Sequence, residues 1–173
     1  MKKEMILVTG GTGYIGSHTV VELQKAGYPV VIVDNLSNSN EEVLDGITNI
    51  TGIKPEFVKA DCTDMEAMKA LFAKYPGIKG IINFAASKAV GESMQKPLLY
   101  YRNNLDTLMN LLDLMAVHEV KGIVFSSSCT VYGEPDENPV TERSPIKKAT
   151  SPYGNTKQIS EEIITDVINA GAP

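Results

Sequence analysis

The segment MILVTGGTGYIG, residues 5–16, carries the main evidence for the fold of this chain. Its first five residues are apolar or β-branched, which is typical of a buried strand, and a helical pattern begins at Tyr14. Between strand and helix, the glycines Gly10, Gly13 and Gly16 follow the spacing G-x-x-G-x-x-G. A strand that passes through a glycine-rich turn into a helix is typical of the first unit of a doubly wound α/β sheet.

Each of these three glycines has a predicted role. Gly10 allows the tight turn, Gly13 lets the backbone approach a pyrophosphate, and Gly16 permits close packing of the helix on the strand. The free amides near Tyr14 and Ile15 then face the anion, because a helix N-terminus carries roughly half a positive charge. The segment therefore predicts a site for dinucleotide phosphates, and the alternative is a glycine-rich turn that binds nothing.

The rest of the chain alternates short apolar runs with longer helical patterns, as in repeated βαβ units. The apolar runs predict strands, covered on both faces, at residues 5–9, 30–34, 56–59, 80–84 and 122–126. The helical patterns lie at residues 14–26, 40–51, 65–75, 103–118 and 152–170. We predict an α/β fold, a Rossmann-type doubly wound parallel sheet with helices on both faces. Residues 133–151, with three prolines and many charges, predict a long surface loop.

Length and composition exclude several classes of protein. A chain of 173 residues is long enough for one compact domain, so we expect a single domain over 1–173. The net charge of −5 argues against a nucleic-acid partner, which favours a basic face. No run approaches the ~20 apolar residues that a membrane span needs, and the chain begins directly with a strand rather than a signal peptide. We expect a cytoplasmic protein that binds neither nucleic acid nor membranes.

The cysteines and histidines suggest no metal chemistry. Cys62 and Cys129 lack metal-ligand spacing, so we expect reduced thiols in a reducing compartment. His18 and His118 fall on predicted helices without clustered partners, which disfavours both a metal site and a Ser-His-Asp arrangement.

Asp34 ends the second predicted strand and is expected to select the cofactor. A carboxylate at this position accepts hydrogen bonds from adenosine ribose hydroxyls and repels a 2′-phosphate, which favours NAD over NADP. The alternative is a turn-capping aspartate. Asp61, after the third strand, is expected to face the adenine edge, although its Asp-x-Thr-Asp context also suits a cap of the next helix.

Tyr153 and Lys157 lie four residues apart on a predicted helix that begins near Pro152, and therefore on one face. An ammonium beside the phenol stabilises phenolate, so Tyr153 is predicted to take a proton from a sugar hydroxyl while hydride leaves the same carbon. A surface Tyr and Lys on an amphipathic helix is the alternative. Ser128, at the carboxyl end of the fifth strand, is expected to contact the substrate hydroxyl, or else to cap a turn.

With these motifs in place, the chain resembles the extended short-chain dehydrogenase/reductase family, which includes the NAD-dependent epimerases and dehydratases. The resemblance runs the whole length and rests on residues 9–19, 34–39, 88–93, 126–133 and 151–154. The motifs DNLSNS at 34–39 and KAVGES at 88–93 resemble those of nucleotide-sugar epimerases in particular. The resemblance implies tightly held NAD+ and a UDP-sugar substrate. The sugar would be oxidised at C4, the 4-keto sugar would rotate, and hydride would return to its other face.

The resemblance also implies a set of site residues. The cofactor would contact Gly10, Gly13, Tyr14, Ile15, Gly16, Asp34, Asn35, Leu36, Ser37, Asn38, Ser39, Asp61, Cys62, Phe84, Ala85, Ala86, Ser87, Lys88, Asn103, Tyr153 and Lys157. The catalytic residues would be Tyr153, Lys157 and Ser128. The pair Ala86-Ser87 differs from the Gly-Leu of many members, which puts a side-chain role for Ser87 in doubt.

Family members continue beyond this length, through further strands and a smaller UDP-sugar-binding domain. We therefore expect an incomplete domain, able to bind NAD but poorly able to turn over the sugar. Homodimers of the family form through two long helices, and the predicted helices 103–118 and 152–170 would be their equivalents. A 4,6-dehydratase is disfavoured, because Ser128, Cys129 and Thr130 stand where its acid would be. A simple NAD-dependent dehydrogenase and a non-catalytic NAD-binding module stay open.

Overall fold

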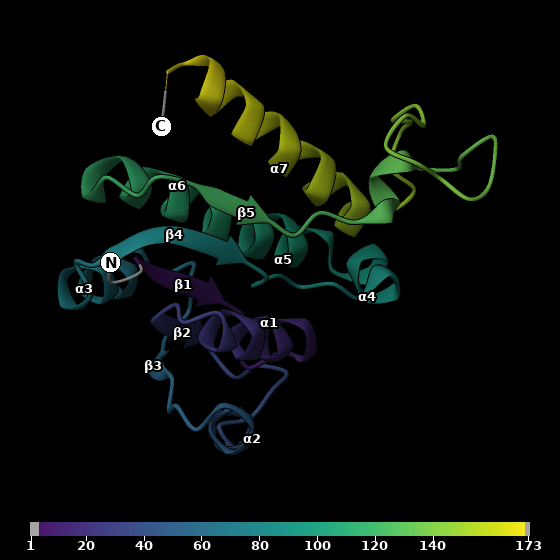
Figure 1. Ribbon diagram of the computed structural model, residues 1–173. Helices are drawn as coiled ribbons and strands as arrows, with labels where there is room; N and C mark the ends of the chain where they lie inside the picture. The colour runs from purple at the N-terminus through teal and green to yellow at the C-terminus, as the bar shows by residue number, and fades with distance from the viewer. Residues whose placement is uncertain (1–3, 172–173) are drawn as a thin grey trace. The chain divides into compact units, whose positions relative to one another are not determined.

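A computed structural model describes residues 4–171 (Figure 1), so residues 1–3 and 172–173 of the expected domain lie outside the described part. The chain forms two compact units. The first unit contains the described residues up to Ala85 together with Met109–Ser126, and the second contains Ala86–Leu108 and the residues from Ser127 onward. The expectation of one domain over 1–173 stays a prediction.

The first unit is built on a parallel sheet of five strands in the order β3-β2-β1-β4-β5. The strands are β1 (Met5–Thr9), β2 (Val30–Asp34), β3 (Glu56–Lys59), β4 (Ile78–Asn83) and β5 (Ile123–Phe125). β1 pairs with β2 on one side and with β4 on the other, so the strand order reverses between β1 and β4. The predicted Rossmann-type parallel sheet is confirmed, and ligands of such sheets bind outside the carboxyl ends of strands at this reversal.

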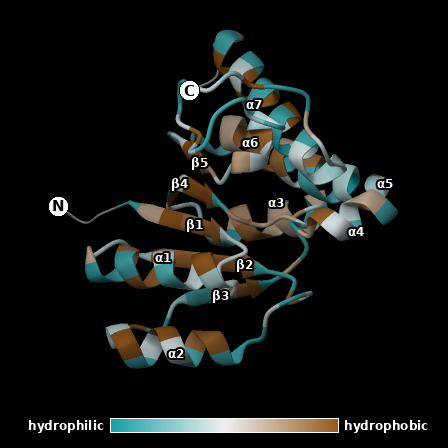
Figure 2. Ribbon diagram, turned by 90° about the vertical axis from the view of Figure 1, so that its right-hand side faces the viewer, coloured by the Kyte–Doolittle hydropathy of each residue, from teal (hydrophilic) through white to brown (hydrophobic). Residues whose placement is uncertain are grey.

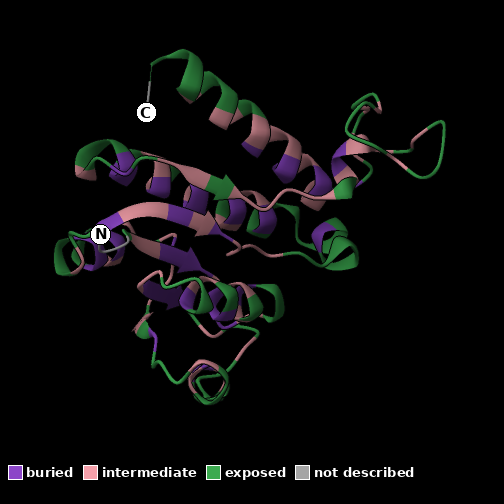
Figure 3. Cartoon of the chain, in the orientation of Figure 1, coloured by how far each residue is buried: buried purple, intermediate pink, exposed green. Residues whose placement is uncertain are grey.

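Helices cover both faces of this sheet. Successive strand residues point to opposite sides, and apolar residues on both sides have to be buried. On one face Val8 and Ile32 pack against α1 (Tyr14–Lys25) and α2 (Glu42–Thr51). On the other, Leu7 packs in a core shared with α3 (Met65–Lys74) and the α6 helix (Thr107–His118). β1 and β2 are hydrophobic in Figure 2 and largely buried in Figure 3.

The second unit carries the remaining helices. These are α4 (Val90–Gln95), α5 (Pro97–Tyr101), a π-helix (Arg102–Asp106), a 3-10 helix (Cys129–Tyr132) and α7 (Pro152–Asn169). All four shorter helices pack against α7. Residues 133–151 form neither helix nor strand, which confirms the predicted loop. Pro152 opens α7, and Ser151 caps it by accepting the Gly154 N–H at 3.1 Å.

Several predicted boundaries were wrong. β4 begins at Ile78 rather than at residue 80, and β5 is limited to three residues. The helix predicted at 103–118 starts as the π-helix and becomes α-helical only at Thr107, while α4 and α5 were not predicted. The edge strands are not covered on both faces either, since Glu56 of β3 is exposed and Val124 of β5 is 63% exposed.

Candidate functional site

The glycine-rich turn joins β1 to α1 in the first unit. Gly10 has a φ of +66°, which L side chains rarely adopt, and a Cβ there would lie 2.8 Å from the Ala85 nitrogen. A Cβ on Gly16 would lie 2.3 Å from the Gly10 carbonyl oxygen. The predicted tight turn at Gly10 is confirmed, whereas Gly16 provides close packing of the helix on the turn itself rather than on the strand.

The N-terminus of α1 is left open. Gly13 is its N-cap and provides no side-chain cap, and the first turn contains no acidic residue. Tyr14 is 78% exposed and Ile15 60% exposed. An uncapped helix N-terminus with its positive dipole end accessible is a suitable place for an anion.

Asp34 connects the glycine turn to the loop after β2. Its Oδ2 accepts the Thr12 N–H at 3.2 Å, and its Oδ1 accepts the Leu36 N–H at 2.9 Å and the Ser39 hydroxyl at 3.3 Å. The turn-capping role is therefore present, and it supports Leu36 at its positive φ of 61°. A carboxylate has about four acceptor sites, so three bonds leave room for a ligand hydroxyl.

Asn35 and Asp61 join the ends of β2 and β3. The Asn35 side chain donates to Asp61 Oδ2 at 3.0 Å, and Thr63 donates to Oδ1 through its N–H at 2.9 Å and its hydroxyl at 2.7 Å. Burial pushes the pKa of Asp61 upward, but these hydrogen bonds outweigh it and hold the pKa below its ordinary value. The cap of α3 is Asp64, which accepts from Glu66 and Ala67, and not Asp61.

Three polar residues support this edge of the sheet but were not predicted. Thr9 donates its hydroxyl to the Asn83 side chain at 2.6 Å and accepts the Ala85 N–H at 3.2 Å. Asn110 of α6 donates to the carbonyl oxygens of Cys62 and Thr63, both at 3.0 Å. Thr9 and Asn83 could have been recognised in the sequence, because each is the polar last residue of a largely apolar strand. No comparable sequence pattern marks Asn110.

In the second unit, two asparagines of the π-helix hold Ser87. Asn103 donates to the Ser87 hydroxyl at 3.2 Å, which gives that side chain a defined partner. Asn104, which was not predicted, accepts the Ser87 N–H at 2.8 Å and donates to the Ser87 carbonyl at 3.0 Å. Lys88 follows directly and is exposed.

Ser128 is the N-cap of the 3-10 helix, so the structure shows it as a turn cap. Its Oγ accepts the Thr130 N–H at 3.3 Å and the Thr130 hydroxyl at 3.0 Å. Gly154 of α7 is packed tightly on Thr130, since a Cβ there would lie 3.2 Å from the Thr130 oxygen. The 3-10 helix therefore lies against the first turn of α7, which carries Tyr153.

Lys157 lies one turn after Tyr153 on α7 and is only 4% exposed. Burial lowers the pKa of Lys157 to about 8, against the opposing effect of the Glu161 carboxylate. The ammonium form is therefore less stable than in water but still predominates at pH 7, and a lysine held in this way responds strongly to a nearby negative charge.

Comparisons with known proteins identify the family. Residues 6–172 match the sequence profile of the NAD dependent epimerase/dehydratase family. The chain belongs to this family. UDP-glucose 4-epimerase of Bacillus subtilis (strain 168) is 52% identical over 165 residues, which is 95% of this chain and 48% of that protein. The human UDP-glucose 4-epimerase is 49% identical over 173 residues, which is 96% of this chain and 49% of that protein.

A solved structure agrees with the family assignment. The crystal structure of UDP-glucose 4-epimerase from Bifidobacterium longum in complex with NAD+ and UDP superimposes with a TM-score of 0.93 at 46% identity. The match covers 96% of this chain and 50% of that one. The chain thus spans about half the length of the relatives it matches.

The predicted residues of this family member fall into two groups. The first unit brings together those at the carboxyl ends of β1 to β4, namely Gly10, Gly13, Tyr14, Ile15, Gly16, Asp34, Asn35, Leu36, Ser37, Asn38, Ser39, Asp61, Cys62, Phe84 and Ala85. The second unit contains Ala86, Ser87, Lys88, Asn103, Ser128, Tyr153 and Lys157.

Among residues 4–171, no helix is both long and apolar enough to cross a membrane.

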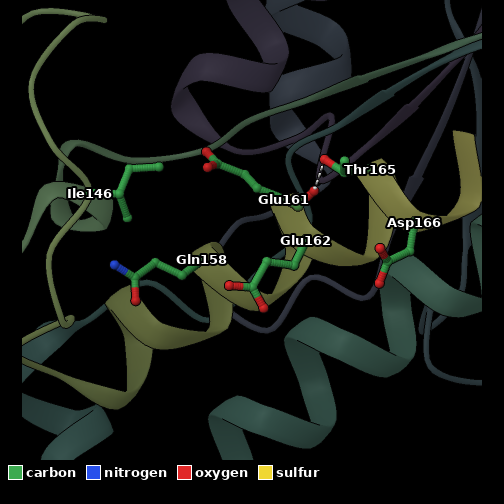
Figure 4. A pocket seen from close by; sticks show the side chains of 6 residues that line it. All are labelled: Ile146, Gln158, Glu161, Glu162, Thr165 and Asp166. Atoms are coloured by element: carbon green, nitrogen blue, oxygen red, sulfur yellow. Dashed lines mark hydrogen bonds between the residues drawn. The ribbon is translucent and has the colours of Figure 1, made fainter. Parts of the chain in front are cut away.

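A hollow on the surface of α7 is a different feature of the second unit (Figure 4). It has a volume of about 420 Å³ and is lined by Ile146, Gln158, Glu161, Glu162, Thr165 and Asp166. Its three carboxylates would repel phosphate, so this hollow does not suit the nucleotide of an epimerase/dehydratase family member.

Proposed function

We propose that this chain is the cofactor-binding part of a UDP-glucose 4-epimerase, which interconverts UDP-glucose and UDP-galactose. The observation that carries the proposal is the buried Lys157 one turn after Tyr153. Relatives of that name at 49–52% identity support the substrate, and the complex of one such structure with NAD+ and UDP supports the cofactor.

The residues of the first unit fit NAD. The open N-terminus of α1 suits its pyrophosphate, and Asp34 has acceptor capacity left for a hydroxyl of the adenosine ribose. Asp61 and Cys62 would border the adenine. A carboxylate at Asp34 also disfavours the 2′-phosphate of NADP. Bound NAD+ would accept hydride from C4 of the sugar and return it.

The residues of the second unit would handle the proton and the substrate oxygen. Tyr153 takes the proton of the C4 hydroxyl and returns it, so that the enzyme ends each cycle unchanged. Lys157 stabilises the phenolate of Tyr153 by its charge, and Ser128 donates a hydrogen bond to the same substrate oxygen. Asn103, Ser87 and Lys88 contribute to cofactor binding.

The proposal includes the setting of the enzyme. We place the enzyme in galactose metabolism. Its two free cysteines support a reducing compartment such as the cytoplasm. We expect a homodimer that assembles through α6 and α7. Light scattering tests the assembly: a strict monomer of the whole protein would contradict this part of the proposal.

Titration calorimetry with NAD+ and NADP+ tests the cofactor assignment on this chain. We expect binding of NAD+, much weaker binding of NADP+, and a loss of about tenfold or more in NAD+ affinity for Asp34→Ala, as a charge-assisted hydrogen bond from the ribose is removed. Asp166→Ala, an exposed carboxylate on α7, is the control and should bind like the wild type. Failure of the wild type to bind NAD+ would refute the proposal.

Turnover of UDP-galactose by the whole protein separates the remaining alternatives. An epimerase shows no net change in reduced nicotinamide absorbance, whereas a dehydrogenase that releases its cofactor shows a steady increase. Tyr153→Phe is expected to lower the rate by about 10²–10⁴-fold, the usual contribution of general acid–base catalysis. NAD+ binding without any turnover would favour the non-catalytic module.

A further inference from the structure

Lys88 is exposed, yet the backbone on both sides of it is held by buried side chains. The residue before it, Ser87, is bound at its N–H and its carbonyl by Asn104, which is 5% exposed. The residue after it, Ala89, donates its N–H to the hydroxyl of Tyr100 at 3.1 Å, and Tyr100 is fully buried. An exposed loop residue rarely has both neighbours fixed in this way, because loops carry fewer buried contacts than helices and strands.

Both holding residues are themselves fixed. The Tyr100 hydroxyl donates to Glu92 at 2.9 Å while it accepts from Ala89, so both of its hydrogen-bonding roles are filled. Burial raises the pKa of Tyr100, and its hydrogen bond to Glu92 and the charge of that carboxylate raise it further. The phenol therefore stays protonated, which the bond to Glu92 requires.

Asn104 extends the arrangement to α7. Its amide nitrogen donates to the Thr156 hydroxyl at 3.0 Å, and Thr156 is fully buried and directly precedes Lys157. Asn104 lies within the five-residue π-helix, a distortion that proteins often use to aim a side chain at a functional site. One buried amide thus ties the Ser87 backbone to the helix that carries Tyr153 and Lys157.

Lys88 itself takes no part in the ion pairs among the described residues. An unpaired ammonium on a rigid backbone is available to a ligand at low entropic cost, because only its side chain has to be ordered on binding.

We propose that Tyr100 and Asn104 are positioning residues that fix the backbone on both sides of Lys88 and thereby present its ammonium to the bound dinucleotide. This inference rests on the proposed function, since the ligand is NAD. Neither residue touches the ligand; each acts through Lys88, and Asn104 also relates Lys88 to α7.

A double-mutant cycle on NAD+ affinity, measured by calorimetry, tests the proposal. Lys88→Met is expected to weaken binding about tenfold, the cost of one charge-assisted hydrogen bond. Tyr100→Phe should weaken it about fivefold in the wild type but less than about twofold in the Lys88→Met background, because a positioning effect disappears with the residue it positions. Asn104→Ala should be non-additive with Lys88→Met in the same sense.

Tyr75→Phe is the matched control. The Tyr75 hydroxyl also donates to a glutamate, Glu56, at 2.9 Å, but it lies in the first unit and has no backbone partner among residues 4–171. Its NAD+ affinity should equal that of the wild type. Full additivity of Tyr100→Phe and Lys88→Met would overturn the proposal, because it would mean that Tyr100 acts on the fold in general.

Amide hydrogen exchange of the unmodified chain gives a second measurement that needs no variant. The amides of Ser87 and Ala89 should be protected by at least tenfold more than those of the loop at 133–151, because they are bound to buried side chains. If the amides of Ser87 and Ala89 exchanged as fast as those of residues 133–151, the backbone on both sides of Lys88 would not be fixed, and the proposal would be contradicted even if every variant were unfolded. A wild type that does not bind NAD+ while both amides are protected would refute the proposed function and with it the role of Lys88 toward NAD, whereas full additivity in a chain that does bind NAD+ would overturn the positioning role alone.

Discussion

Replacing Lys157 by Met should stabilise the nucleotide-free chain, and the gain should depend on pH. Burial lowers the pKa of Lys157 from 10.5 to about 8, and the residue is 4% exposed. Each pKa unit corresponds to about 1.4 kcal/mol, so the buried ammonium costs about 3 kcal/mol of folding free energy at pH 7. The methionine has a similar length and is uncharged, and should recover about 1–3 kcal/mol of this cost, allowing for lost contacts.

The sign of the pH dependence follows from proton binding. Between pH 8 and 10.5 the unfolded chain keeps the Lys157 proton that the folded chain has lost, so the stability of the wild type rises with pH across this window. The variant lacks this rise. The advantage of Lys157→Met is therefore greatest below pH 8 and disappears by about pH 10.5.

Urea unfolding at pH 7 and at pH 10, followed by circular dichroism, measures the effect. Lys69→Met is the control, since Lys69 is exposed and forms an ion pair with Glu66 on the same helix, and it should change stability by less than about 0.5 kcal/mol at either pH. A stability difference between Lys157→Met and the wild type that is equal at the two pH values would refute the reasoning.

Other changes test other parts of the structure. Ser160→Ala should stabilise by about 1 kcal/mol in urea unfolding, because the buried Ser160 hydroxyl finds no hydrogen-bond partner among the described residues; a loss of stability would contradict this. Gly16→Ala should destabilise by about 2 kcal/mol or more, since its Cβ would collide with a backbone oxygen, whereas Gly77→Ala meets nothing within 4 Å and serves as control. Iodoacetamide should modify the exposed Cys129 in the native chain and Cys62 only after unfolding, because burial raises the pKa of Cys62 to about 12; mass spectrometry showing equal labelling would argue against this burial.

The first βα unit is the part of the fold that local sequence predicts best. β1 has the predicted bounds, and α1 begins at Tyr14 as predicted, because the continuous apolar run and the positive φ required at Gly10 act within a few residues. The segment between Lys88 and Thr107 was predicted poorly. Its helices are short, and the π-helix is stabilised by bonds from Asn103 and Asn104 to a residue 16 or 17 positions away.

The candidate site shows the same division. Asp34, Tyr153 and Lys157 could be chosen from spacing, because strand ends and helical faces have fixed periods. The environments of these residues could not be predicted. The hydrogen bond between Asp34 and Thr12, for example, spans 22 residues and requires β1 and β2 to pair. Thr9 with Asn83, and Tyr100 with Ala89, were missed because the sequence does not show which polar residues meet.

Local sequence was sufficient for the order of the five strands, the longer helices, the glycine turn and the identity of the chemical groups, because these depend on local conformation and periodicity. The burial of Lys157 and the exposure of Lys88 follow from the tertiary structure alone: Lys157 is buried although its sequence neighbours Thr156 and Gln158 are polar, whereas Lys88 is exposed although Ala89 and Val90 follow it. Burial, and with it the lowered pKa of Lys157, depends on packing between segments distant in sequence, and that packing also brings Asn104 to Thr156, 52 residues away.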